Sequence, residues 1–144
     1  MKIKRFEDIV GWQKARELVK AIYEVTIQSK GFDKDYGLKD QIRRAAVSSM
    51  SNVAEGFGRY SDKKFANFLN FARGSLAEVQ SQLYVAIDLN YIDKNEFDTA
   101  YNLADETSRL LTNFMKYLRN PSGPDSSTWT PDSRTRDSQT QDSA

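Results

Sequence analysis

The fold is decided by residues 41–59, QIRRAAVSSMSNVAEGFGR, which predict one helix with two distinct faces. At about 100° per residue, small and apolar residues gather on one side. They are Leu38, Ile42, Ala45, Ala46, Ser49, Val53 and Phe57. A polar stripe gathers within about 80° on another side. It consists of Gln41, Arg44, Ser48, Asn52, Glu55 and Arg59. Because the apolar face is built from small residues, a neighbouring helix can approach it closely.

The polar stripe has three interpretations. It is a solvated helix face, a hydrogen-bonded seam between helices or subunits, or a surface that contacts phosphates. In the second interpretation, Arg44 and Arg59 lie near Glu55. A buried seam has to be fully hydrogen-bonded, because a half-satisfied one costs several kcal/mol.

The first predicted helix runs from about Asp8 to Ser29, with Gly31 as its C-cap. A short loop, GFDKDYG at residues 31–37, leads to the helix of the polar stripe, which ends near Gly56–Gly58. The next helix begins after Ser61, a suitable N-cap.

This third helix continues to about Leu89, and Asn90 is suited to the left-handed conformation that ends it. Asp93 and Glu96 predict a capping box that opens the fourth helix, which Pro121 stops. Strand-like alternation between hairpin turns is absent from the sequence. These elements predict an all-α fold, an antiparallel up-down-up-down four-helix bundle.

Two of the helices carry more apolar residues than a single core stripe needs. Six residues lie beside the expected stripes: Phe71, Gly74, Val85, Leu103, Leu110 and Tyr117. They indicate either a broad core face or an interface between subunits, and periodicity does not decide between the two. A glycine in mid-helix is unfavourable by about 1 kcal/mol, so Gly74 predicts a close approach of another helix.

The chain of 144 residues has the length of one domain. All three prolines follow Asn120, and the dipeptide Asp-Ser recurs four times after it. Such a composition buries too little apolar surface to offset the entropy of ordering. We expect a four-helix domain at residues 1–119 and a disordered Ser/Asp/Thr-rich tail at residues 120–144.

The sequence contains no cysteine and no histidine, which removes thiol chemistry, Ser–His pairs and the Glu-x-x-His motif of di-iron bundles. We therefore expect no catalytic residues, no metal site, no cofactor and no enzymatic activity. The sequence has no uninterrupted apolar run of about 18 residues. We expect a cytoplasmic protein that does not enter the membrane.

Positive charge is concentrated in the middle of the chain. Seven basic residues offer candidate contacts to nucleic acid: Lys39, Arg43, Arg44, Arg59, Lys63, Lys64 and Arg73. Residues 1–119 carry 19 Lys and Arg against 16 Asp and Glu, a smaller excess than dedicated nucleic-acid binders usually show.

A set of spaced residues resembles the four-helix-bundle family encoded in intervening sequences of 23S rRNA, whose members are often labelled ribosomal proteins. The matching residues are Gln41, Arg43, Arg44, Ala45, Ala46, Ser48, Asn52, Ala54, Glu55, Gly56, Arg59, Phe65, Phe68, Ala72, Gly74, Ser75, Leu76 and Glu78. The segment FEDIVGWQKA at residues 6–15 also resembles the start of that family. The resemblance covers about residues 5–119.

The resemblance implies an antiparallel four-helix bundle that assembles into a ring-like homo-oligomer, typically a pentamer. It also implies kinship in fold with the accessory protein of diversity-generating retroelements, which binds nucleic acid and partners a reverse transcriptase. Because the family pattern keeps polar residues along the stripe, we favour the hydrogen-bonded seam there.

We therefore expect a non-enzymatic homo-oligomer that acts as an assembly or adaptor protein. The alternative is a protein that binds structured RNA or DNA, as a reverse-transcriptase accessory factor does.

Overall fold

The computed structural model describes residues 3–120, and the regular secondary structure of these residues is helical, with no strand among them. The prediction of an all-α fold is confirmed. The elements are η1 (Phe6–Asp8), α1 (Val10–Gln28), α2 (Lys30–Lys34), α3 (Tyr36–Phe57), α4 (Asp62–Asp88) and α5 (Lys94–Arg119). The predicted tail, apart from Asn120, lies outside the described residues.

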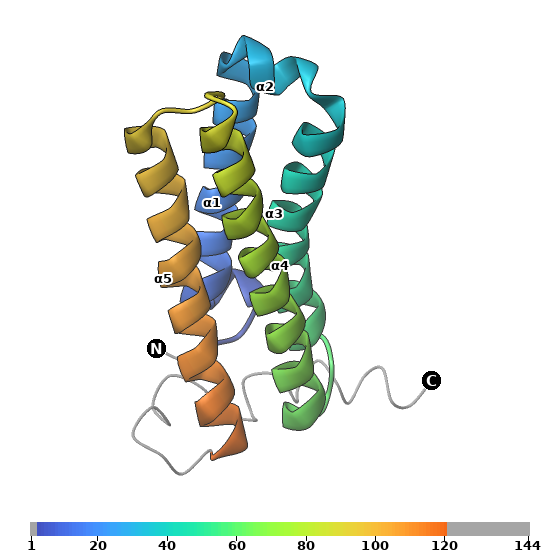
Figure 1. The fold of residues 1–144 in the computed structure, drawn as a ribbon. Coiled ribbons are helices and arrows are strands. Elements are labelled where there is room, and N and C mark those ends of the chain that lie inside the picture. Colours follow the sequence, from blue (N-terminus) through green and yellow to red (C-terminus); the bar gives the residue numbers. More distant parts are fainter. Residues whose placement is uncertain (1–2, 121–144) are drawn as a thin grey trace.

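The four long helices lie side by side (Figure 1). Helix α2 and the α4–α5 connection are at one end, and the α3–α4 turn is at the other. Helices α3 and α5 each pack against both α1 and α4. Helices α1 and α4 therefore stand at opposite corners, and Figure 1 shows that both run from the lower end towards the upper end. Among the described residues, no helix is long and apolar enough to cross a membrane.

The core lies between the four long helices. Each of them contributes aliphatic side chains with no exposed surface, such as Leu18, Ile42, Leu69 and Leu111. The buried hydroxyl groups of Ser49 and Thr107 donate to carbonyl groups of their own helix, Ser49 Oγ to Ala46 O at 2.6 Å and Thr107 Oγ1 to Leu103 O at 2.7 Å. This satisfies them without a partner on another helix.

Predictions of the helix ends in the second half of the chain are confirmed. The Ser61 hydroxyl accepts the Lys64 N–H at 3.3 Å, and Asn90 has a φ of 60°. Asp93 and Glu96 form the capping box, with bonds of 2.7 and 3.0 Å. These caps depend on residues close in sequence, so the sequence reveals them.

The prediction of a loop at residues 31–37, between the first two long helices, is wrong. The first long helix begins at Val10 and ends at Gln28, and what was predicted as a loop contains the short helix α2. Ser29 caps α2 by accepting the Phe32 N–H at 3.2 Å. Gly31 is therefore inside α2 and is not the C-cap of α1.

Burial of Phe32 explains this short helix. Its side chain is fully buried and packs on the Tyr91 ring, 5.5 Å away between centroids. Gly31 lies so close to that ring that an added Cβ would stand 2.8 Å from it. The Tyr91 hydroxyl donates to Asp35 Oδ2 at 3.0 Å, and this bond, followed by burial, raises the pKa of Tyr91. The Tyr91–Asp35 hydrogen bond therefore holds the α4–α5 connection against the start of α3.

Candidate functional site

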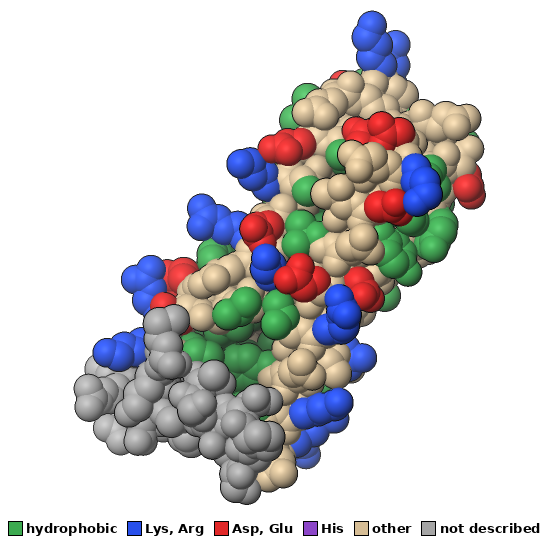
Figure 2. Space-filling view, turned by 90° about the vertical axis from the view of Figure 1, so that its left-hand side faces the viewer, with side chains coloured by type: hydrophobic (Ala, Val, Ile, Leu, Met, Phe, Trp, Pro, Cys, Tyr) green, Lys and Arg blue, Asp and Glu red, His purple; other side chains and the backbone are tan. Residues whose placement is uncertain are grey.

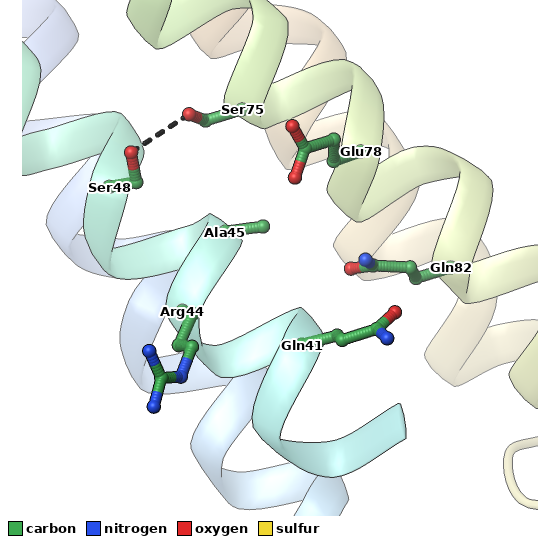
Figure 3. Close-up of a pocket in the computed structure, with 7 residues that line it drawn as sticks. All are labelled: Gln41, Arg44, Ala45, Ser48, Ser75, Glu78 and Gln82. Atoms are coloured by element: carbon green, nitrogen blue, oxygen red, sulfur yellow. Dashed lines mark hydrogen bonds between the residues drawn. The ribbon is translucent and has the colours of Figure 1, made fainter. Parts of the chain in front are cut away.

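The polar stripe lies along α3 on the side next to α4 and forms one wall of a surface groove. We call this the α3–α4 groove. Its lining residues are Gln41, Arg44, Ala45 and Ser48 from α3, and Ser75, Glu78 and Gln82 from α4 (Figure 3). Ala45 and Ser48 are small, so the groove has a low floor between longer side chains.

The middle of the groove holds a hydrogen-bonded chain of short side chains. Ser75 Oγ donates to Ser48 Oγ at 3.0 Å, which links α4 to α3 (Figure 3). Asn52 Nδ2 donates to Ser48 O at 2.9 Å and to Ser48 Oγ at 3.0 Å. This part of the stripe is a hydrogen-bonded contact between helices of one subunit.

The arginines of the stripe are not part of that chain. Arg59 pairs with Glu55 at 3.0 Å, as their spacing predicts, but Arg44 pairs with Asp40 at 2.8 Å. The Arg44 side chain is 80% exposed. Both pairs join residues four apart whose side chains are exposed, where such pairs contribute only about 0.2–1 kcal/mol. The two arginines of the stripe are thus engaged in local contacts and leave the groove open.

Acceptor groups of α4 line the open part of the groove. Figure 3 shows Glu78 and Gln82 extending from α4 towards α3. Gln82 Oε1 is buried and has no hydrogen-bond partner among the described residues. A buried unpaired acceptor costs about 1–3 kcal/mol, so this atom marks a place where a donor is favoured. Glu78 is exposed and forms no ion pair with the described residues.

Exposed apolar side chains continue from the groove along the outer side of α4. Phe71 is 58% exposed, Val85 44% and Leu89 51%. Leu89 was not predicted as an exposed apolar residue, because the sequence pattern indicated it only as the end of its helix. An added Cβ at Gly74 would meet nothing within 4 Å. The close approach predicted at Gly74 is therefore not made by a helix of the same subunit.

Gly56 is the glycine that brings α3 and α4 together. Its added Cβ would stand 2.7 Å from Phe68 Cβ and 2.9 Å from Phe65 Cδ1. The sequence pattern predicted a close helix approach at Gly74 and only a helix end near Gly56, whereas the close approach within the subunit is at Gly56.

The second apolar stripe of α5 packs inside its own subunit. Tyr117 is buried, with 6% exposed, and burial raises the pKa of its hydroxyl. Leu103 is half-buried against the core, and Leu110 is half-buried with its Cβ near Gly11. Of the two interpretations left open by the sequence, Tyr117 fits the broad core face, because α5 packs between α1 and α4.

The predicted nucleic-acid contacts do not form one patch. Lys39 lies in the first turn of α3 and Arg59 lies just past its last residue, Phe57, so about 27 Å of helix separates Lys39 from the end where Arg59 lies. Arg43 is engaged internally, with Nε donating to Thr26 Oγ1 at 2.9 Å and its guanidinium 4.4 Å from the Tyr23 ring centre. Arg73 is half-buried, and its Nη1 is 3.8 Å from Met115 Sδ of α5.

The remaining basic residues lie at the two ends of α3. Lys39 pairs with Asp33 at 3.0 Å beside Arg43 and Arg44. At the other end, Arg59 is followed by Lys63 and Lys64, which are exposed at the start of α4.

Charge on the α5 side of the molecule is mixed. Figure 2 shows Lys and Arg interspersed with Asp and Glu there, with hydrophobic side chains gathered between them. Within residues 3–120, no group of three or more Asp and Glu residues could hold a metal ion.

Comparison with known proteins identifies a protein family and solved structures that are similar to this chain. The model of the 23S rRNA-intervening sequence protein family matches residues 7–113. The chain is also similar to a solved structure described as a protein with unknown function from the S23 ribosomal protein family of Bacteroides thetaiotaomicron. That similarity has a TM-score of 0.67 and 25% identity, covering 74% of this chain and 98% of the other. No curated protein matches the chain.

Proposed function

Because the chain belongs to the family of 23S rRNA-intervening sequence proteins, we propose that it is a non-enzymatic protein that assembles with copies of itself. Each subunit is an antiparallel four-helix bundle, and the subunits form a ring-like homo-oligomer, with a pentamer as the expected size. The assembly acts as an adaptor or scaffold in the cytoplasm.

The outer side of α4 is the observation that carries this proposal. Phe71 and Val85 are 58% and 44% exposed, and an added Cβ at Gly74, between them in the sequence, would meet nothing within 4 Å. Glycine costs a helix interior about 1 kcal/mol relative to alanine, and no contact inside the subunit explains that cost. Large apolar side chains around a small residue are typical of surfaces that another protein covers.

Light scattering on the purified protein tests the assembly. We expect a mass that is a multiple of the 16.5 kDa chain at micromolar concentration. The double variant Phe71→Asp, Val85→Asp should raise the dissociation constant at least about a hundredfold, because each charge would be buried without a partner. Tyr36→Asp is the matched control, since Tyr36 is 72% exposed on α3. A monomeric wild-type protein under these conditions contradicts the proposal.

Nucleic-acid binding is the second candidate, and Lys63 and Lys64 favour it. Both are exposed at the first turn of α4, and neither forms an ion pair with the described residues. The amide groups of a first helical turn and nearby ammonium groups together attract phosphate. Structured RNA, or a complex with a reverse transcriptase, is the partner class for this surface.

Salt dependence of RNA binding tests the second candidate. We expect the logarithm of the affinity to fall linearly with the logarithm of salt concentration. The variant Lys63→Gln, Lys64→Gln should lower the slope by about 0.9 for each duplex phosphate that is no longer neutralised. Lys94→Gln serves as the control, because Lys94 already pairs with Asp98 at 2.7 Å. Absence of binding to RNA and DNA at about 50 mM salt, where this attraction is strong, rejects the candidate.

A further inference from the structure

The outer face of α1 carries exposed residues at heptad spacing. Gln13, Lys20 and Ile27 are seven residues apart, and Ile27 is 63% exposed. Arg16 follows Gln13 by three residues and Tyr23 follows Lys20 by three, so these two residues form a second, parallel row beside the first. Lys20 is exposed and forms no ion pair with residues 3–120. The first row is not suited to the core of the subunit, because its middle residue, Lys20, carries a charged ammonium group.

The outer face of α4 has the same spacing. Phe71, Glu78 and Val85 are seven residues apart, with Gly74 and Ser81 in the parallel row. All five residues are exposed. Heptad spacing on two facing helices lets side chains interlock along a shallow crossing angle.

Aligning the two rows in parallel pairs complementary residues at two of the three levels, and it sets Gln13 opposite Phe71 at the third. Lys20 comes opposite Glu78, which joins an ammonium to a carboxylate that has no ion-pair partner among the described residues. Seven residues further on, Ile27 comes opposite Val85. Shifting this alignment by one turn would place Lys20 opposite Gly74 or Gln82, where no carboxylate is available to pair with it.

The parallel rows are complementary in size. In the same alignment, the long side chain of Arg16 faces Gly74, and Tyr23 faces Ser81. The space beside Gly74, empty for at least 4 Å around an added Cβ, then receives the aliphatic stem of an arginine. This gives the mid-helix glycine a role that nothing in its own subunit supplies.

We propose that α4 of one subunit packs in parallel against α1 of a second copy of this chain, with Glu78 paired to Lys20. The inference rests on the proposed self-assembly and names the surfaces that carry it. Both rows belong to this chain, and their charge and size match, which favours a second copy over an unrelated partner. Because α1 and α4 stand at opposite corners, one subunit cannot satisfy both rows itself, so the contact continues from copy to copy.

Charge reversal with rescue tests the contact. Lys20→Glu and Glu78→Lys should each weaken self-association at least about tenfold, because each places like charges opposite one another. The double variant should associate within about threefold of the wild type. An equimolar mixture of the two single variants should recover association in part, because each supplies the face that the other needs, while a five-membered ring leaves at least one contact between like charges. Sedimentation velocity over a concentration series measures all four samples.

Controls separate this inference from the proposed function. Lys116→Glu, an exposed reversal on α5, should leave self-association unchanged, and circular dichroism should show the same helix content in every variant. If the wild type is monomeric, the proposed function fails. If the wild type associates and the single variants associate equally well, or the double variant is not rescued, the α1–α4 contact is wrong while self-assembly stands.

Discussion

Phe65→Ala is expected to lower the free energy of unfolding by about 3–5 kcal/mol, more than any exposed substitution on the same helix. Phe65 is fully buried. Its ring centre is 6.2 Å from that of Phe57 and 5.3 Å from that of Phe114, so the ring joins α3, α4 and α5. Removing it exposes apolar surface and leaves a cavity that rigid helices cannot close.

Chemical denaturation followed by circular dichroism measures this effect. Phe71→Ala is the matched control, because it removes the same side chain from the same helix at a site that is 58% exposed. In the separated subunit, Phe71→Ala should change stability by no more than about 0.5 kcal/mol. Both series need several protein concentrations, since association adds to apparent stability. A decrease below about 1 kcal/mol for Phe65→Ala would contradict the core packing described above.

Gly56→Ala is expected to destabilise the subunit by about 1–3 kcal/mol, although alanine favours helices more than glycine does. The new methyl group would stand 2.7 Å from Phe68 Cβ and 3.3 Å from Phe65 O. Both atoms are fixed to the α4 backbone, so the helices would have to separate to admit it.

Gly74→Ala is the control with the opposite expected sign. Nothing lies within 4 Å of its added Cβ, so the subunit should gain about 0.4–1 kcal/mol from the smaller entropy of the unfolded chain. Thermal or urea unfolding of the two variants at equal, low concentration compares them. Equal stabilisation by both substitutions would show that α3 and α4 are not in contact at Gly56.

The sequence predicted features that depend on neighbours in the chain. The helix of the polar stripe, the Ser61 cap and the Asp93–Glu96 box all follow from spacings of three or four residues. Helix α2 escaped prediction because it has only five residues, and burial of Phe32 against Tyr91 stabilises it. Tyr91 is distant in sequence, and no local pattern indicates that contact.

The site was predicted less completely than the fold, for the same reason. Helical periodicity placed Gln41 and Ser48 on one face, but it gave no sign that Ser48 would receive a hydrogen bond from Ser75 of α4. It also left open whether Tyr117 belongs to the core or to a subunit interface, because counting apolar residues does not reveal how wide a face the neighbouring helices cover. Pairing of Arg44 with Asp40, where Glu55 had been expected, depends on side-chain rotamers.

Arg43 can attract a polyanion by its charge, but it has few free donor groups with which to recognise one. Its charge still adds to the electrostatic potential outside α3, but its Nε proton and the flat face of its guanidinium are already engaged with Thr26 and Tyr23. A polyanion drawn towards this end of the molecule would meet fewer free donors than the count of basic residues indicates. Any encounter there would be long-ranged, indifferent to base sequence and quickly abolished by added electrolyte.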